Sequence, residues 1–317
     1  MAVRSTLACL VLLLVHVVLV TLYASAFALL LPFGRARIRR CIAAYCLVDW
    51  VDLLSVLFPV ATLTLSGDAP RTATAATPIV LVANHQVDAD WWYLQQYVRL
   101  VGAVPQLKLC MKSSLAYVPC MGWTMALLEF LFLRRDLVHD KPHVQQYMES
   151  FVEDAFPVWL MLFPEGTTIH TECVTKSQAF ATAQGRPTLE RVLLPGAAGL
   201  QLLLDAYANT DVKPEIYDIT IGYPSYAGEV PTYEMAATST RVCPPCNGWS
   251  RAMGRRSCIC TSRATPLQPS PATIVGFLDR QWSQKEHWLA HFAQHENRHD
   301  AVLCNDSHSR RATTGTI

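Results

Sequence analysis

The chain has 317 residues, with 26 Lys and Arg against 25 Asp and Glu and a formal net charge of +1 at pH 7. This balance provides no basic excess for binding nucleic acid, which is excluded as an expected partner. Hydrophobic residues make up 51% and charged residues 16% of the chain, a composition that favours a membrane setting. The length is enough for one α/β core with an anchor and a C-terminal extension.

The apolar excess is concentrated at the N-terminus. No Asp, Glu, Lys or Arg lies between Arg4 and Arg35, and Leu7 to Leu31 is almost wholly apolar. That run exceeds the ~20 residues of a spanning helix, so residues 1–34 are predicted to be a transmembrane anchor. A cleaved signal peptide is the alternative, since Ala24-Ser-Ala26 has the small residues of a cleavage site.

Positive charges follow this run. One arginine precedes the predicted helix, whereas four follow it, at positions 35, 37, 39 and 40. The positive-inside rule therefore places the rest of the chain on the cytosolic side.

A second apolar segment, Cys41 to Leu65, contains Asp49 and Asp52, three positions apart and so on one helix face. The carboxylates disfavour a second span. We expect a helix lying in the head-group layer, with the preceding arginines drawn to anionic lipid; a buried helix of the main domain is the alternative. Residues 68–78 form a polar, proline-bounded linker.

His85 and Asp90 stand five positions apart, directly after the apolar run 78–83. An apolar run of that length predicts a buried strand, with the histidine at its carboxyl end. Imidazole can accept a proton near neutral pH, and a carboxylate on its second nitrogen orients it. The pair is a candidate base with its orienting residue. In the alternative, the histidine only begins a helix capped by Asp88 or Asp90.

Strands and helices alternate from about residue 78 to residue 223. The patterns predict helices over Trp91–Val101, Pro142–Phe156 and Ala179–Gln184, and strands over Pro78–Ala83, Met125–Leu133, Val158–Leu162, Val192–Leu194 and Asp218–Tyr223. Together these elements predict an α/β domain with a mixed sheet.

Charged residues between these elements have two interpretations. Arg135 follows an apolar run and can offer a bidentate guanidinium to a phosphate, or it can form a solvated ion-pair cluster with Arg134 and Asp136. Lys108 and Lys112 lie four positions apart, so instead of binding a ligand they could lie on the solvent-exposed face of a helix.

The segment Phe163-Pro-Glu-Gly-Thr-Thr168 follows the strand expected at 158–162. Gly166 permits close backbone approach, and Thr167 adds a hydroxyl beside Glu165, so the segment can cradle a polar ligand. A plain strand-to-loop turn is the alternative. The chain has no G-x-S-x-G elbow, so a covalent acyl-enzyme has no support in the sequence.

The chain changes character after Pro224, where Pro, Gly, Ser and Thr become common. A helix is predicted over Thr273–His295, with Trp282, Leu289 and Phe292 along one side. Residues 296–317 have the composition of a disordered tail.

Four of the eleven cysteines lie close together, at positions 243, 246, 258 and 260. A C-x2-C pair is a common zinc half-site, but the C-x-C spacing of the second pair is less usual. We expect reduced thiols and no metal.

The motifs occur together in a specific order. His85-x4-Asp90, Phe132-Leu-Arg-Arg135, Phe163–Thr168 and Leu193-Leu-Pro195 resemble the four blocks of the glycerolipid acyltransferase family, and Lys112–Trp123 resembles its eukaryotic lysophosphatidic acid and lysocardiolipin acyltransferase branch. The resemblance covers roughly residues 35–295.

This resemblance implies an acyltransferase that esterifies the sn-2 hydroxyl of lysophosphatidic acid or a related lysophospholipid. Acyl-CoA would be the co-substrate, with no other cofactor. His85 would be the general base and Asp90 its orienting residue. The binding roles of the family carry over to Arg135, Glu165, Gly166, Thr167 and Lys112.

Two positions depart from the family pattern. Thr168 stands where many relatives have arginine, and Gly196-Ala-Ala-Gly199 replaces the Arg-Thr-Lys-Gly that some eukaryotic branches show. Positive charges that could face a phosphate are therefore missing at both places, which leaves the acceptor head group open.

The expected organisation is an anchor (1–34), a basic segment with interfacial helix and linker (35–77), a catalytic domain (78–223), a C-terminal extension (224–295) and a tail (296–317). The fold class is the α/β, glycerolipid acyltransferase type, a mixed sheet flanked by helices. We expect an endoplasmic reticulum membrane protein with a cytosolic catalytic domain, in contact with membrane lipids. A CoA-independent transacylase and a non-catalytic membrane protein are the alternatives.

Overall fold

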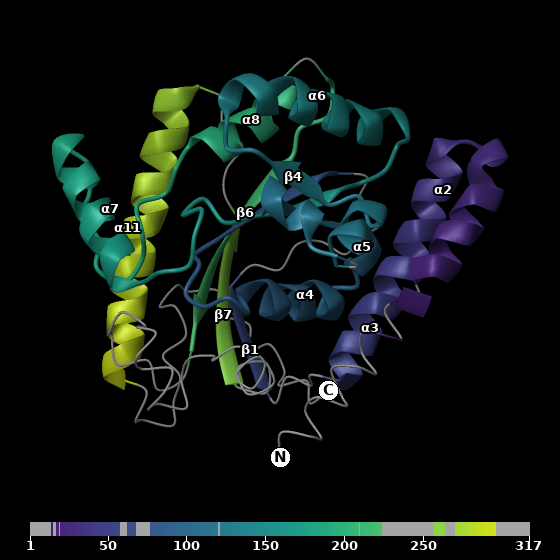
Figure 1. Cartoon of the computed structure of the whole chain (residues 1–317). Helices are drawn as coiled ribbons and strands as arrows, with labels where there is room; N and C mark the ends of the chain where they lie inside the picture. Colours follow the sequence, from purple (N-terminus) through teal and green to yellow (C-terminus); the bar gives the residue numbers. More distant parts are fainter. Residues whose placement is uncertain are drawn as a thin grey trace.

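The computed structural model describes residues 14, 17–18, 20–57, 62–67, 77–119, 121–208, 210–223, 256–263 and 270–295. Within them, seven strands form one sheet in the order β1-β7-β6-β2-β5-β3-β4 (Figure 1). The strands are β1 (Thr62–Gly67), β2 (Ile79–Ala83), β3 (Leu107–Lys112), β4 (Leu131–Leu133), β5 (Trp159–Leu162), β6 (Glu215–Gly222) and β7 (Arg256–Arg263). Neighbouring strands are parallel except β6 and β7, so the predicted mixed sheet is confirmed.

Strand β2 is the middle strand of the seven and has a parallel neighbour on each side. Ile79 is in register with Trp159 of β5 on one side and with Glu215 of β6 on the other. Beyond β5 the sheet continues in the same direction through β3 and β4. The carboxyl ends of these strands therefore share one edge, which is where sites of parallel α/β sheets form.

Helices cover both faces of the sheet (Figure 1). An N-terminal group comprises a helical stretch at residues 20–30, then η1 (Leu31–Phe33), α2 (Arg35–Cys41), the π-helical η2 (Ile42–Leu47) and α3 (Val48–Leu57). The others are α4 (Asp90–Leu100), η3 (Val104–Gln106), η4 (Ser113–Tyr117), α5 (Met121–Leu127), α6 (Leu137–Glu153), α7 (Thr171–Ala183), α8 (Ala198–Tyr207) and α11 (Pro271–His295).

Two hydrophobic cores form because the side chains of each strand alternate between the two faces. Ile79, Leu81 and Ala83 of β2 join a cluster with α4 and the N-terminal helices. Val80 and Val82 join the opposite cluster, with α6, α8 and α11. All five residues of β2 are buried, which explains why this strand reads as an unbroken apolar run.

The segment expected to lie in the lipid head-group layer packs on the domain. Leu47 and Val51 are fully buried in the first core. Asp49 accepts a hydrogen bond of 2.8 Å from the Tyr23 hydroxyl, and Asp52 accepts one of 3.0 Å from Arg99. The structure therefore favours the alternative, a helix of the main domain. The last residues of the predicted segment 41–65 belong to strand β1.

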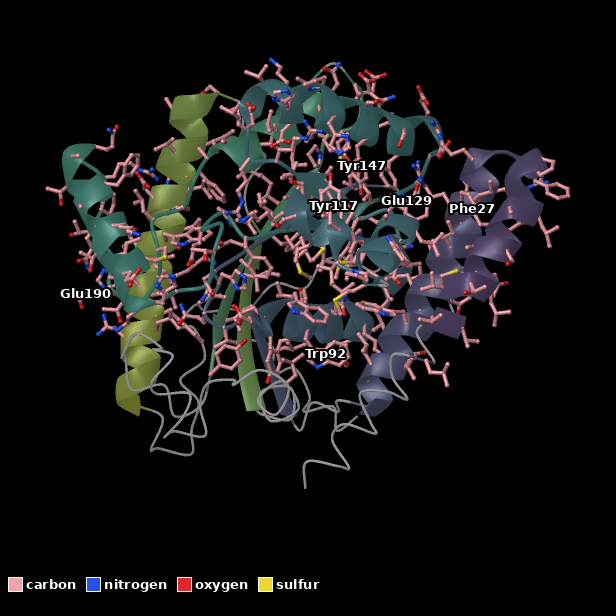
Figure 2. All side chains as sticks on the ribbon, viewed as in Figure 1. Phe27, Trp92, Tyr117, Glu129, Tyr147 and Glu190 are labelled. Carbon is pink, nitrogen blue, oxygen red and sulfur yellow. The ribbon has the colours of Figure 1, made fainter. Side chains whose placement is uncertain are left out.

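Three of the four arginines expected to meet anionic lipid bind the domain instead. Arg39, only 4% exposed, donates to Glu129 at 2.9 Å and to Asp154 at 2.6 Å. Arg35 also bonds Asp154, and Arg40 donates to its backbone oxygen at 2.7 Å. Figure 2 labels Glu129 on the side of the domain that faces the N-terminal helices. This network fixes the N-terminal helices against α6.

Several expected elements differ from the observed ones. The strand predicted over 125–133 is helix α5 followed by the short β4, and residues 192–194 belong to no strand. Helix α6 begins five residues earlier than predicted because the Asp136 side chain caps it by accepting from Val138 N at 3.0 Å. Helix α7 starts eight residues early, and α8 was not predicted.

Lys108 and Lys112 lie on β3 and not on a helix. Lys108 is fully buried, and its ammonium donates to Leu128 O at 2.7 Å and lies 3.7 Å from a Glu129 oxygen. Burial lowers the pKa of Lys108 to about 8. Lys112, at the end of the strand, is exposed.

Part of the predicted transmembrane run at 7–31, including residues 7–13, lies outside the described residues, as do nearly all of the linker, the tail, Cys243 and Cys246. Among the helices described, none combines the length and hydropathy of a membrane span. The predicted domain boundaries stay predictions, although β1 and β7 extend the sheet beyond residues 78–223.

Arg39→Ala should strongly destabilise the domain, because it leaves the carboxylates of Glu129 and Asp154 without their shared buried cation. We expect a loss of about 3 kcal/mol or more in the free energy of unfolding, measured by urea denaturation in mild detergent. Arg37→Ala, at an exposed position on the same helix, should change it by no more than about 0.5 kcal/mol. Equal effects of the two substitutions would contradict this account of the network.

Candidate active site

The predicted site residues come together at the carboxyl edge of the sheet. His85 follows β2, Glu165 and Gly166 follow β5, Lys112 ends β3, and Arg135 follows β4. These four strands are consecutive in the order β2-β5-β3-β4 and all run parallel. Residues that are far apart in the sequence are thus neighbours because of the sheet order.

The His85 imidazole is oriented by a buried carboxylate. Its Nδ1 lies 2.9 Å from Oδ2 of Asp90, the first residue of α4, which is fully buried. The same oxygen accepts from the backbone N–H of Gln86 and of Val87, and the other oxygen accepts from the Tyr223 hydroxyl. Asp90 therefore binds the turn and the histidine, and its side chain is not an N-cap of α4.

The loop that carries His85 is fixed on both sides. The Asn84 amide, fully buried, donates to Ile221 O at 3.0 Å and accepts from Ile221 N at 2.8 Å. The His85 ring stacks on Phe163, with ring centroids 4.3 Å apart. The backbone oxygen of His85 accepts from Ile169 N at 3.1 Å. Few rotamers remain open to the imidazole.

Opposing effects set the pKa of His85. Burial lowers it, but the hydrogen bond and charge of Asp90 raise it, with further contributions from Glu165 and Asp88, and the net result is a pKa above the usual value. The side chain is 18% exposed. With Nδ1 occupied by Asp90, Nε2 is the nitrogen that can exchange a proton with a ligand.

Glu165 connects four parts of the chain. One carboxylate oxygen accepts from the Trp282 indole N–H at 3.0 Å and from His85 N at 3.3 Å. The other accepts from Leu193 N at 3.2 Å. The loops after β2 and β5, the Leu193 segment and helix α11 thus meet at one acidic side chain.

This position makes Glu165 a weaker acid than an ordinary glutamate. Burial raises its pKa to about 7, although the hydrogen bonds from Trp282, Leu193 and His85 and the charge of His85 act in the opposite direction. At neutral pH the group can therefore be found with or without its proton. Its role as a direct substrate ligand stays a prediction, since both oxygens already accept hydrogen bonds from the protein.

Arg135 is presented by a strained turn. Its backbone has φ +65°, in the left-handed region, and its N–H and that of Arg134 donate to the buried Asp140 carboxylate at 2.8 and 2.9 Å. The exposed Arg135 guanidinium donates to the backbone oxygen of Gly166. The Arg135 loop and the Glu165 turn are therefore joined directly.

Other predicted positions line the same edge. Lys112 and Thr167 are exposed, and Thr168 is partly exposed. Gly196 N donates to Pro164 O at 2.9 Å. The segments that contain Gly196 and Thr168, the two positions where positive charge was expected, are therefore in contact. The bonds described above link His85, Asp90, Glu165, Gly166 and Arg135.

Tyr223, Asp140 and Trp282 were not predicted to take part in the site. Tyr223 and Asp140 support Asp90 and the Arg135 loop, and no local pattern marks either one. Trp282 belongs to an apolar helix face, which is a signal for burial only. A buried indole N–H nevertheless needs a hydrogen-bond acceptor. This requirement was the signal in the sequence that Trp282 would bond to a polar group.

Helix α11 is fastened along its length to the segments around the site. Asp279 accepts from Arg186 at 2.6 Å, and Arg186 in turn donates to Pro195 O at 3.0 Å. Lys285, almost fully buried, pairs with Asp218 at 2.8 Å. Glu286 accepts from the backbone N–H of Glu190, which Figure 2 labels beside α11. Trp282 is thereby held in place over Glu165.

Trp282→Phe should raise the pKa of Glu165 from about 7 by on the order of one pKa unit, because it removes a donor that favours the charged carboxylate. The measurement is a ¹³C NMR titration of side-chain-labelled glutamate, with the Glu165 signal assigned by its loss in Glu165→Gln. Trp288→Phe, on the same helix, is the control and should leave the titration unchanged. An unaltered Glu165 titration in Trp282→Phe would refute the coupling.

Comparisons with known proteins show what this chain is similar to. A family model described as Acyltransferase matches residues 66–221. The chain is 32% identical over 189 residues to "Probable 1-acyl-sn-glycerol-3-phosphate acyltransferase 5" of Arabidopsis thaliana, covering 58% of this chain and 48% of that protein. It is 30% identical over 162 residues to "Lysocardiolipin acyltransferase 1" of Danio rerio, covering 51% and 42%. The chain spans about half the length, or less, of these curated relatives.

The matched region 66–221 contains strands β2, β3, β4 and β5, all of β6 except its last residue, and every predicted site residue. A solved structure, the 1-acyl-sn-glycerophosphate (LPA) acyltransferase PlsC from Thermotoga maritima, aligns at 16% identity and a TM-score of 0.46, covering 94% of this chain and 99% of that one. That structural likeness is distant. The family model and the curated relatives support the glycerolipid acyltransferase family for the matched region of this chain.

Proposed function

We propose that the chain is an acyl-CoA-dependent acyltransferase that esterifies the sn-2 hydroxyl of lysophosphatidic acid or a related lysophospholipid. The observation that carries the proposal is the His85 imidazole, held through Nδ1 by Asp90 at 2.9 Å on the carboxyl edge of the sheet. An alcohol is a weak nucleophile until it loses its proton. A positioned base removes this barrier and typically contributes ~10² to 10⁴ in rate.

The reaction needs no covalent enzyme intermediate. The acceptor oxygen attacks the thioester carbonyl carbon as its proton moves to Nε2 of His85, and Asp90 stabilises the imidazolium that forms. The C–S bond then breaks, and the proton passes from Nε2 to the departing sulfur of CoA. One ester forms, one thioester is lost, and His85 returns to its neutral state.

Binding of an anionic head group is assigned to the cations of the same edge. Arg135 is exposed and is held beside the Glu165 turn by its bond to Gly166 O, and exposed Lys112 ends the neighbouring strand β3. Thr167 adds an exposed hydroxyl. A pKa of about 7 allows Glu165 to hold a proton at neutral pH, which reduces its repulsion of a nearby phosphate.

The acceptor is left open by the two departures from the family pattern. Thr168 and Gly196 carry no charge where relatives have positive side chains, so the site has fewer cations to meet a phosphate monoester. A diester head group carries less charge than a monoester at neutral pH and needs fewer partners. We therefore include lysophosphatidylinositol and lysocardiolipin among the candidate acceptors.

The setting is part of the proposal. A lipid acceptor requires access to a membrane, and the apolar run at residues 7–31 supports an N-terminal transmembrane anchor. We place the catalytic domain on the cytosolic side of the endoplasmic reticulum, where acyl-CoA is present, in phospholipid biosynthesis or remodelling. Acyl-CoA is a co-substrate, and the proposed chemistry uses no further cofactor.

A lysolipid panel tests the function. The purified chain in vesicles is given ¹³C-oleoyl-CoA with lysophosphatidic acid, lysophosphatidylinositol or lysocardiolipin, and in parallel a ¹³C-acyl phospholipid as donor without CoA. We expect label at the sn-2 position of at least one acceptor, with an equal amount of free CoA released. A chain purified identically but heat-denatured is the control. No transfer to any acceptor would contradict the function, and transfer from phospholipid alone would contradict the acyl-CoA donor.

A further inference from the structure

An exposed apolar surface follows strand β3. We define the 115–123 patch as Leu115, Tyr117, Val118, Met121 and Trp123, which come from η4, α5 and the turn between them. Tyr117, labelled in Figure 2, is 84% exposed and Trp123 is 61% exposed. The other three are each more than a third exposed. Large apolar side chains gathered in this way on a surface mark an interaction site.

The patch is rigid. A Cβ added at Gly122 would lie 2.3 Å from the backbone oxygen of Ala116, so only glycine allows α5 to pack this closely on η4. The Gly122 N–H donates to Val118 O at 2.8 Å, and Met121 N donates to Pro119 O at 2.7 Å. The apolar side chains are therefore displayed by a tightly packed turn and not by a loose loop.

Positive charge borders the patch. Exposed Lys112 immediately precedes η4, and it is in register with Leu133, which leads to the exposed Arg134 and Arg135. Segment η4 also packs against both β3 and β4. An apolar surface with amphipathic rings thus adjoins a row of cations at the carboxyl edge that holds the proposed site.

We propose that the 115–123 patch is the surface by which the catalytic domain docks on a phospholipid membrane. Tyrosine and tryptophan favour the membrane–water interface, because their rings are apolar and their tips hydrogen-bond. Neighbouring Lys and Arg complement the phosphates of the head-group layer. The choice of lipid over a protein partner rests on the proposed function, in which the acceptor is a lipid.

Docking in this way explains how an acceptor reaches His85. The rings enter the head-group region, and the cations beside them meet phosphates at the same depth. Lys112 and Arg135 border the patch and are also assigned to the acceptor head group. A lysolipid can therefore pass from the membrane surface to the site without its head group leaving the interface.

The test measures whether Trp123 touches lipid in the full-length chain. The chain is reconstituted in vesicles of phosphatidylcholine and phosphatidic acid whose acyl chains are brominated, a quencher of nearby tryptophan fluorescence. We expect Trp123→Phe to lose a clear share of the quenched emission seen in the parent, which has eight tryptophans. Trp288→Phe on α11 is the matched control and should not lose quenched emission.

A gain-of-signal variant completes the design. Adding Tyr117→Trp to Trp123→Phe should restore the quenched component, because position 117 is more exposed than position 123. Circular dichroism checks that each variant is folded. If quenching is unchanged by Trp123→Phe and by the added tryptophan, the docking surface is refuted. A vesicle-independent dimer that dissociates in Tyr117→Ser would likewise overturn it, by assigning the patch to a second copy of the chain.

The outcome is independent of catalysis. Quenching of Trp123 in a chain that transfers no acyl group would mean that the proposed function fails while the docking surface stands. Acyl transfer without quenching of Trp123 would mean that the inference fails alone.

Discussion

One partly buried carboxylate, that of Glu165, holds the candidate site together. It accepts hydrogen bonds from His85 N, Leu193 N and the Trp282 indole, and these donors come from three segments that are distant in sequence. Burying a carboxylate is costly unless hydrogen bonds compensate, so the three donors and the acid depend on one another. The shape of the site therefore relies on helix α11 as much as on the motif that contains Glu165.

Much of the fold follows from local pattern. β2 and β5 are unbroken apolar runs because both faces of the central sheet are covered, and α11 has an apolar face that includes Trp282 and Leu289. The end of helix α5 was predicted as part of a strand over 125–133, because a short apolar run fits a helix or a strand equally well until tertiary packing decides. The close contact of Gly122 with η4 is such a packing effect.

Some contacts of the candidate site could be predicted from the sequence, and others depend on the tertiary structure. The His85–Asp90 and Arg135–Gly166 contacts join residues that motif spacing had already selected. Tyr223 and Trp282 reach the site only because β6 lies beside β2 and α11 crosses the domain, and nothing local in the sequence specifies either arrangement. The arginines at 35, 39 and 40 were predicted to contact lipid from their position in the sequence. In the structure they bind the domain.

The central claim is that His85 is the base for acyl transfer, and the pH dependence of kcat/KM for the parent and His85→Ala tests it most directly. Because Asp90 raises the pKa of His85 above its usual value, the parent should gain activity as pH rises through a pKa above ~6.5. His85→Ala should lose ~10² to 10⁴ in rate and that rise in activity, whereas the exposed His143→Ala should match the parent. Equal rates and an unchanged profile in His85→Ala would contradict the account.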